Sequence, residues 1–228
     1  MKNDFFDFDD VFVVVPAFNE GKNIGSVLSL ILDEGFRNVV VVDDGSSDDT
    51  FFIAKSFPVV VLRHAVNLGK GCALKTGTLF SLKHDAKVIV FIDSDLQHDP
   101  KDIKRFLKVL YEKDVDVVFA FRNFDSNMPF VFRLGNFFID FVFKFLFGKS
   151  IRDTQNGFKV FKSNIFKFIE WNSCNYSVET EIAVNTVKNN LSFFQVNIDT
   201  VYIDKYKGTT IFDGFKIVKD IFWFKIKR

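Results

Sequence analysis

Two aspartates one residue apart stand where a strongly apolar segment of this chain ends. The segment, VIVFI at residues 88–92, is followed by Asp93, Ser94 and Asp95, and then by Gln97. A short uninterrupted run of β-branched and aromatic residues predicts a buried strand. Two carboxylates at such a strand end are costly unless a cation lies between them, and hard oxygen ligands suit Mg²⁺ or Mn²⁺. The alternative is an acidic turn that only caps the next helix.

The same arrangement recurs along the first half of the chain. Apolar runs occupy residues 11–15, 38–42, 58–62, 88–92 and 115–120. Polar clusters follow them at residues 16–20, 43–47, 67–71, 93–97 and at Arg122. Segments with helical spacing separate the runs, and Ser46 or Ser47 is expected to N-cap the second helix. Strands that alternate with helices predict an α/β fold with a parallel sheet covered on both faces, in which ligands bind beyond the carboxyl ends of the strands.

Composition limits the class of protein. A chain of 228 residues can form one large domain with a substantial core. The net charge is +1 and there is no basic stripe, which argues against nucleic acid as a partner. The first ten residues lack the basic start of a signal peptide, so none is expected. Cys72 and Cys174 lie far apart in the sequence and indicate neither a disulfide framework nor a zinc site, as is typical of a reducing compartment.

Eight short motifs carry a resemblance to a known family. In chain order they are VVVPAFNE, VVVDDGSSDDT, NLGKG, FIDSDLQHDP, FRNF, RLGN, DTQNGFKVF and YSVETEI. This ordered set resembles family 2 glycosyltransferases with the GT-A fold, and more narrowly the synthases that make polyprenyl-phosphate or dolichyl-phosphate sugars. The resemblance covers most of the chain. It implies one Rossmann-like domain, with a nucleotide-sugar-binding half at about 8–122 and an acceptor-binding, membrane-interface portion at about 123–228.

The resemblance implies a pocket for the base and ribose of the donor. Its lining would be Pro16, Phe18, Glu20, Val42 and Asp44. Carboxylates can accept hydrogen bonds from base N–H groups or ribose hydroxyls, and Phe18 can pack on a ring face. The alternative for Glu20 is a charge that complements a helix dipole, and the alternative for Phe18 is simple core packing.

The diphosphate of the donor would bind next to this pocket. By the same resemblance, Asp93, Asp95 and Gln97 hold a metal, and Ser94 belongs to the donor site. A metal there stabilises the leaving nucleoside diphosphate as a Lewis acid.

Two lysines complete the expected donor side. Lys70 opens a helix after a glycine-rich loop, which suggests phosphate binding, although backbone packing would explain the glycines equally well. Lys205 stands where many mannose-type members have Arg, which leaves the sugar open.

The acceptor side is expected to depend on arginine. Planar guanidinium groups bind phosphate bidentately, and in the resembled family arginines at the positions of Arg122 and Arg133 hold the acceptor phosphate. Such an acceptor is already an anion and needs no general base. Asp153 would lie near the sugar or this phosphate, unless it only forms an Asx turn. Glu179 and Glu181 would touch sugar hydroxyls or, alternatively, serve as helix N-terminal charges.

Two segments are expected at a membrane surface. Residues 130–147 place their polar side chains on one helical stripe and aromatic or aliphatic ones elsewhere: Arg133, Asn136, Asp140 and Lys144. Three charges argue against a membrane crossing and favour an interfacial helix, with a buried core helix as the alternative. Residues 211–228 repeat this pattern with a basic end that suits anionic headgroups.

The sequence therefore predicts metal-dependent, inverting transfer of a hexose from UDP-glucose or GDP-mannose to a polyprenyl or dolichyl phosphate. An N-acetylhexosamine donor is also open. The expected location is peripheral, on the cytoplasmic face of a membrane, without a spanning helix but with room for a membrane-embedded partner subunit. Two other functions remain: transfer to a sugar hydroxyl of a glycan, which needs a base such as Asp153 or Glu179, and a non-catalytic nucleotide-sugar-binding subunit.

Overall fold

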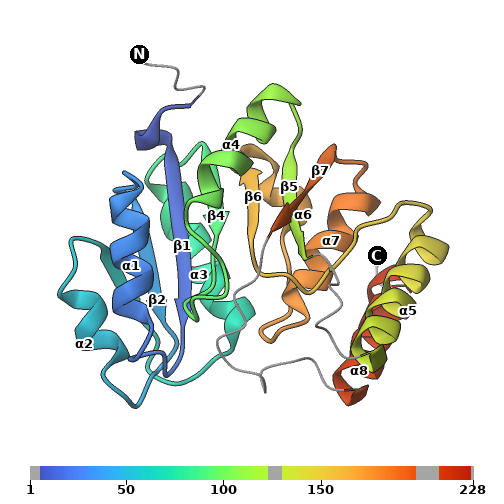
Figure 1. Cartoon of the computed structure of the whole chain (residues 1–228), viewed down its shortest axis with the longest axis horizontal. Coiled ribbons are helices and arrows are strands. Elements are labelled where there is room, and N and C mark those ends of the chain that lie inside the picture. Colours follow the sequence, from blue (N-terminus) through green and yellow to red (C-terminus); the bar gives the residue numbers. More distant parts are fainter. Residues whose placement is uncertain (1–5, 123–129, 199–210, 227–228) are drawn as a thin grey trace.

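The computed structural model describes residues 6–122, 130–198 and 211–226. For residues 130–136 and 211–216 it describes the backbone only. The described residues form a seven-stranded sheet in the order β3-β2-β1-β4-β6-β5-β7 (Figure 1). The strands are β1 Val11–Ala17, β2 Val39–Asp43, β3 Val60–Arg63, β4 Val88–Phe91, β5 Val117–Arg122, β6 Lys159–Lys162 and β7 Phe193–Ile198. All five strands expected from apolar runs are present, the third and fifth beginning two residues later than predicted.

The sheet is mostly parallel, as predicted. β1 pairs in parallel with β2 and β4, β2 with β3, and β5 with β7. β6 is antiparallel to both of its neighbours, β4 and β5. The sequence analysis did not predict this strand, because four residues with lysine at both ends give no apolar run. β6 and β7 belong to the second half of the chain, so both halves contribute to one sheet.

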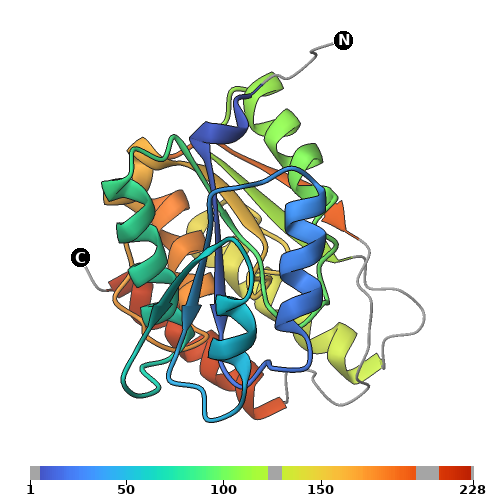
Figure 2. The same ribbon diagram turned by 90° about the vertical axis from the view of Figure 1, so that its left-hand side faces the viewer.

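Helices cover both faces of the sheet. They are α1 Ile24–Asp33, α2 Thr50–Lys55, α3 Lys70–Lys83, α4 Asp102–Glu112, α5 Phe130–Phe147, α6 Phe166–Ile169, α7 Val178–Lys188 and α8 Ile211–Ile226, with short 3₁₀ turns at Phe8–Asp10 and Ser163–Ile165. Figure 2 shows α1 and α4 on one side of the sheet and α3 on the other. Side chains alternate along a strand, so Val13 packs with the α1 and α4 core while Val14 packs with the core of α3, α5, α7 and α8.

Parallel pairing brings the carboxyl ends of β1, β2 and β4 to the same edge of the sheet. The register aligns Ala17 with Asp43, and Val14 with both Val40 and Phe91. β1 runs downward in Figure 1, so this edge is the lower one in that view. The loops that follow these strands therefore meet in one region.

Two local predictions are wrong. The helix after β2 is not N-capped by Ser46 or Ser47: it begins at Thr50, and the Ser46 hydroxyl instead accepts the Asn19 N–H at 2.9 Å. The hydroxyl joins two loops across the sheet edge, a use that spacing along the chain cannot indicate.

The two cysteines are also paired, contrary to the expectation of separate thiols. The loop before α7 folds back onto the first turn of α3 and joins Cys174 to Cys72 across 102 residues. The Gly71 N–H donates to the Cys174 carbonyl at 2.8 Å in the same place.

α5 and α8 lie side by side at the far end from α1 and α2 (Figure 1). Ile139, Val142 and Phe143 of α5 and Ile221 of α8 are buried between these helices and the rest of the protein. None of the described helices combines the length and the apolarity that a membrane crossing needs.

Candidate active site at the carboxyl edge of the sheet

The loop after β4 carries the acidic pair, and hydrogen bonds fix its path. The Ser94 hydroxyl donates to the Pro16 carbonyl of β1 at 2.9 Å, and Leu96 has a positive φ of 63° that turns the chain back. The Gln97 N–H then donates to Asp95 Oδ1 at 3.1 Å. Ser94 is buried and braces the loop, so the two aspartates are held at fixed positions beyond β4.

Asp93 is bound to a partly buried lysine from the start of α3. Lys70 Nζ lies 2.6 Å from Asp93 Oδ1 and 2.7 Å from Glu179 Oε1, so it joins the β4 loop to the first turn of α7. Burial would raise the pKa of Asp93, but Lys70 and His98 outweigh it and lower this pKa to about 2. Burial would likewise lower the pKa of Lys70, yet its two carboxylate partners raise it above the usual value. Gly157 lets the backbone of its loop lie against the Asp93 carboxylate, because a Cβ at this position would be only 2.3 Å from Asp93 Oδ2.

The pKa of Asp95 is shifted in the opposite direction from that of Asp93. Burial and the neighbouring charge of Asp93 raise the pKa of Asp95, and the Gln97 N–H and Lys70 offset this only in part. A carboxylate that is disfavoured as an anion is a place where an added cation gains energy. The oxygen donors of Asp93 and Asp95 therefore fit Mg²⁺ or Mn²⁺. Within the described ranges no three His, Cys, Asp or Glu side chains gather to hold a metal by themselves, so a metal here would need oxygens from a bound phosphate.

Arg122, at the end of β5, is bound bidentately by Asp153. Asp153 Oδ2 accepts from Arg122 Nε at 2.7 Å, and Asp153 Oδ1 accepts from Arg122 Nη2 at 2.8 Å. Asp153 is buried, has a positive φ of 51° and also accepts from Asn156 Nδ2 at 3.2 Å. Burial would raise the pKa of Asp153, but the guanidinium lowers it. The structure thus brings together Arg122 and Asp153, two residues that the sequence assigned to the acceptor.

His98 lies beside the Asp93 carboxylate. Its ring is buried, packs against Phe158 at a centroid distance of 5.6 Å, and places Nδ1 3.9 Å from Asp93 Oδ2. Burial lowers the pKa of His98 to about 4, and the charges that act on it include Asp93, Arg122 and Asp153. The loop from Asp153 to Gly157 joins the two clusters, because Asp153 binds Arg122 and Gly157 lies against the Asp93 carboxylate. The acidic pair and the arginine therefore belong to a single site.

Two buried side chains in this region were missed or left undecided by the sequence analysis. Lys159, at the start of β6, is almost fully buried and donates to the Asn156 carbonyl; burial lowers its pKa to about 8. A lysine directly before an apolar VF pair was the available signal. Glu179 is buried too, and its Oε2 has no hydrogen-bond partner in the described part of the chain.

Glu181 has a structural role in this arrangement. Its carboxylate accepts from the N–H groups of Asn172 and Ser173, with distances of 2.9–3.1 Å. Glu181 is therefore turned toward the loop before α7 and fixes that loop.

The residues expected around a nucleotide differ in how accessible they are. Phe18 is 46% exposed, whereas Val42 is fully buried and packs under α3. Asp44 is buried and accepts from the N–H groups of Leu68 at 2.9 Å and Gly69 at 2.7 Å. Asp44 thus braces the loop before α3.

The remaining residues expected around a nucleotide are placed as follows. Pro16 pairs with Val42 in the sheet, and Glu20 accepts from Asn23 Nδ2 at 2.7 Å. The side chain of Arg133, on α5, and the whole of Lys205 lie outside the described residues.

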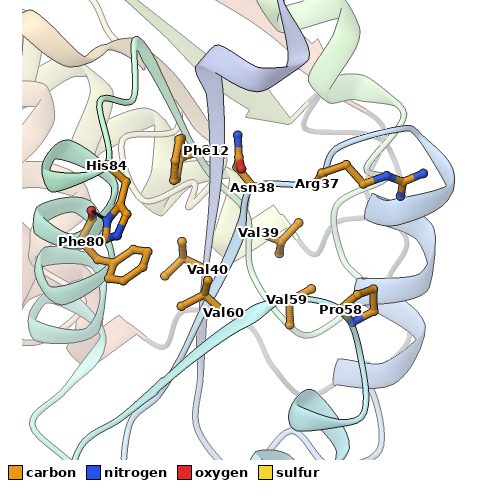
Figure 3. Close-up of a pocket in the computed structure, with 10 residues that line it drawn as sticks. All are labelled: Phe12, Arg37, Asn38, Val39, Val40, Pro58, Val59, Val60, Phe80 and His84. Carbon is orange, nitrogen blue, oxygen red and sulfur yellow. Dashed lines mark hydrogen bonds between the residues drawn. The ribbon is translucent and has the colours of Figure 1, made fainter.

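A pocket lies at the other end of the sheet. It has a volume of about 410 Å³ and is lined mainly by apolar side chains near the amino ends of β1, β2 and β3 (Figure 3). Its polar groups are already bonded: Arg37 Nη1 donates to the Leu32 carbonyl, and the His84 ring is bonded to the Phe80 carbonyl. The residues expected to do chemistry are absent from its lining, so we place the site at the carboxyl edge.

Comparison with known proteins gives an independent view of the same residues. The family described as glycosyl transferase family 2 matches residues 12–185. The UDP-N-acetylglucosamine–dolichyl-phosphate N-acetylglucosaminyltransferase of Methanococcus voltae is 27% identical over 243 residues, 96% of this chain and 97% of the relative. The dolichyl-phosphate hexose transferase of Haloferax volcanii is 29% identical over 197 residues, 85% and 83% of the two chains.

A likeness in structure extends over the same length. The glucosyl-3-phosphoglycerate synthase from Mycobacterium tuberculosis, crystallised with Mn²⁺, UDP-glucose and phosphoglyceric acid, matches with a TM-score of 0.75 at 20% identity. The match covers 96% of this chain and 80% of that chain. At this level of identity the likeness bears on the fold alone.

Proposed function

The chain belongs to glycosyl transferase family 2 and is a glycosyltransferase with the GT-A fold, and from this premise we propose that it transfers a sugar from a nucleotide-sugar donor to a polyprenyl or dolichyl phosphate. The observation that carries the proposal is the loop from Asp153 to Gly157, which binds Arg122 through Asp153 and lies against the Asp93 carboxylate at Gly157. A site with carboxylates at one end and a guanidinium at the other suits a metal-bound diphosphate and an anionic acceptor. Two relatives are named for transfer to dolichyl phosphate.

On the donor side, we assign Asp93 and Asp95, with Gln97 nearby, to a resident Mg²⁺ or Mn²⁺. That ion, when bound, would supply Lewis-acid stabilisation of the diphosphate that leaves. Lys70 keeps Asp93 ionised and fixed in place, because its ammonium lies 2.6 Å from that carboxylate. Glu179 Oε2 is buried without a hydrogen-bond partner in the described chain and is suited to accept from a sugar hydroxyl. Phe18 and Glu20, at the end of β1, are proposed to contact the nucleoside.

On the acceptor side, Arg122 and Arg133 are proposed to hold the phosphate. Asp153 orients the Arg122 guanidinium through two hydrogen bonds, which fixes the direction in which its positive charge is presented to the phosphate. The phosphate oxygen is an anion and attacks the anomeric carbon directly, so we propose a single displacement with inversion and no general base. A glycan hydroxyl acceptor would need such a base, but Asp153 is bound by Arg122 and Glu179 is paired with Lys70.

The acceptor is a lipid, and the protein has a surface suited to meet it. The exposed apolar side chains of α5 and α8, which we call the aromatic face, are Phe137, Phe138, Phe141, Phe145, Phe222, Trp223 and Ile226. Exposed lysines flank it at positions 144, 149, 219 and 225. An apolar face with basic residues at its margin suits an anionic bilayer, so we propose a peripheral location on the cytoplasmic face of a membrane. A membrane-embedded partner subunit is not part of this proposal.

The proposal covers the whole chain as one domain, because strands of both halves share the sheet. The donor sugar is left to experiment, among UDP-glucose, GDP-mannose and UDP-N-acetylglucosamine. Purified protein with Mn²⁺ or Mg²⁺ and a polyprenyl phosphate would be given each labelled donor separately. We expect label in the organic extract from one donor, lost in Asp95→Ala and Arg133→Ala but kept in Asp33→Ala, an exposed aspartate on α1. Absence of a lipid product from every donor, despite metal-dependent nucleotide binding, would overturn the acceptor assignment.

A further inference from the structure

The start of α7 is held from two sides. On one side Glu179, in its first turn, pairs with Lys70 and through it with Asp93. On the other side the hydroxyl of Ser177, the residue before the helix, donates to Asp220 Oδ2 of α8. The helix that lines the site is therefore connected directly to a helix of the aromatic face.

This use of Ser177 is unusual for its position. A serine that precedes a helix normally accepts an N–H from the first turn, but Ser177 makes no such bond. Its hydroxyl is turned to α8 instead, and the Asp220 carboxylate comes close to the positive end of the α7 dipole. A charge from another helix thus takes the place of the local cap.

A second contact ties the other end of α7 to the same helix. Lys188 Nζ, in the last turn of α7, donates to the Phe224 carbonyl of α8 at 3.1 Å. Because α8 is attached at both ends of α7, a displacement of α8 would carry α7 with it.

α8 presents different residues to its two sides. Asp220 and the buried Ile217 and Ile221 face the protein, while Trp223, 60% exposed, belongs to the aromatic face. Three consecutive side-chain contacts therefore lead from α8 to the acidic pair: Asp220 to Ser177, Glu179 to Lys70, and Lys70 to Asp93. The first contact is a hydrogen bond to a carboxylate and the other two are ion pairs of 2.7 and 2.6 Å.

We propose that Asp220 is a positioning residue that couples the seating of α8 on a bilayer to the donor site, through Ser177 and the first turn of α7. The inference rests on the proposed function, since it takes the bilayer as the partner of the aromatic face. It predicts that an anionic bilayer without acceptor changes the affinity of the protein for the nucleoside diphosphate. Allosteric couplings of this kind typically correspond to about fivefold or more in affinity.

The test measures binding of UDP and of GDP with Mn²⁺, in the presence and absence of acceptor-free vesicles of phosphatidylcholine and phosphatidylglycerol in equal parts. For the wild type we expect vesicles to tighten binding of one nucleotide about fivefold. Asp220→Ala and Ser177→Ala should float with vesicles as the wild type does but lose this tightening. Asp220→Asn, which can still accept from Ser177, should keep it, as should Lys219→Ala, an exposed neighbour on α8.

Two results would overturn the coupling. One is a wild type whose nucleotide affinity is the same with and without vesicles. The other is an Asp220→Ala or Ser177→Ala protein that keeps the full tightening. If one of these two variants fails to fold, the other carries the test. The failure of the proposed function would look different: vesicles would tighten nucleotide binding, yet no sugar would reach the lipid phosphate.

Discussion

Two acidic pairs lie at the carboxyl edge of this sheet, and they differ in what surrounds them. Asp43 lies 3.0 Å from Arg63 Nε and accepts the Ser46 N–H, while Asp44 accepts two N–H groups and lies 2.6 Å from His64 Nδ1. Every charge of this first pair is balanced by donors of the protein.

The second pair, Asp93 and Asp95, is balanced at one member only. Lys70 keeps the pKa of Asp93 low, but burial and Asp93 itself raise the pKa of Asp95. The comparison teaches that an acidic pair at a strand end is not a cation site by residue type alone. The first pair, in which each carboxylate is held by hydrogen bonds and by Arg63 or His64, stabilises the loops. The second pair keeps one disfavoured anion, Asp95, and is the place for a cation.

The largest effect is expected from Asp95→Asn. Loss of a metal ligand removes several kcal/mol of transition-state stabilisation, so transfer should fall by about 10³-fold or more. The melting temperature should not fall, because the substitution removes a charge that the folded state disfavours. Rates measured under saturating donor and metal, with Asp33→Asn as the control, check this. An active Asp95→Asn protein would contradict the assignment of the second pair.

Lys70→Met tests the balanced half of the second pair. It leaves the partly buried Asp93 and the buried Glu179 without their cation, and breaking such an ion pair costs about 3 kcal/mol. Urea unfolding measures the loss, and Lys70→Arg should restore part of it because the positive charge is kept. Unchanged stability of Lys70→Met would mean that the two carboxylates do not depend on this lysine.

Asp44→Ala tests the first pair. It leaves the Leu68 and Gly69 N–H groups and the His64 ring without their acceptor, which should cost about 2 kcal/mol of unfolding free energy. The affinity of the folded protein for Mn²⁺ should stay close to that of the wild type. If Asp44→Ala lost Mn²⁺ binding at unchanged stability, the first pair would be the metal site and this assignment would be wrong.

The pH dependence of stability separates the two members of the second pair. The folded pKa of Asp93 is about 2, below its unfolded value of 3.8, so its contribution is present above pH 3.8 and is lost as pH falls toward 2. Asp93→Asn should therefore lower the unfolding free energy at pH 7 by about 1–2 kcal/mol and much less near pH 2. Asp95, whose folded pKa is raised, has the opposite sign: its contribution is largest below pH 3.8 and is lost as pH rises. Denaturation curves of both Asn variants across this range check the signs.

Much of the fold followed from the sequence, and so did the edge of the sheet at which we propose the site. Apolar runs of five or six residues predicted the five parallel strands, and parallel pairing requires their polar ends to meet at one edge. The ordered motifs predicted the family, which the match over residues 12–185 confirms.

What the sequence did not indicate depends on segments that fold back from the second half of the chain. The ion pair of Lys70 with Glu179, the pair of Arg122 with Asp153 and the disulfide of Cys72 with Cys174 all join residues far apart in the chain. Each exists because the stretch from Asp153 to Glu179 returns across the sheet edge, and β6 is part of that return. Local propensity carries no information on which buried charge such a segment will meet. The sequence therefore suggested only phosphate binding for Lys70, not its ion pairs, and did not single out Lys159.

The most direct test of the central claim is a calorimetric titration of Mn²⁺ into the protein with saturating nucleoside diphosphate. It would compare the wild type with Asp95→Asn, Asp44→Asn and the control Asp33→Asn. We expect the wild type, Asp44→Asn and Asp33→Asn to bind the ion with similar affinity and Asp95→Asn to lose it, while unfolding shows a stability loss in Asp44→Asn alone. Undiminished Mn²⁺ binding by a folded Asp95→Asn protein would contradict the account.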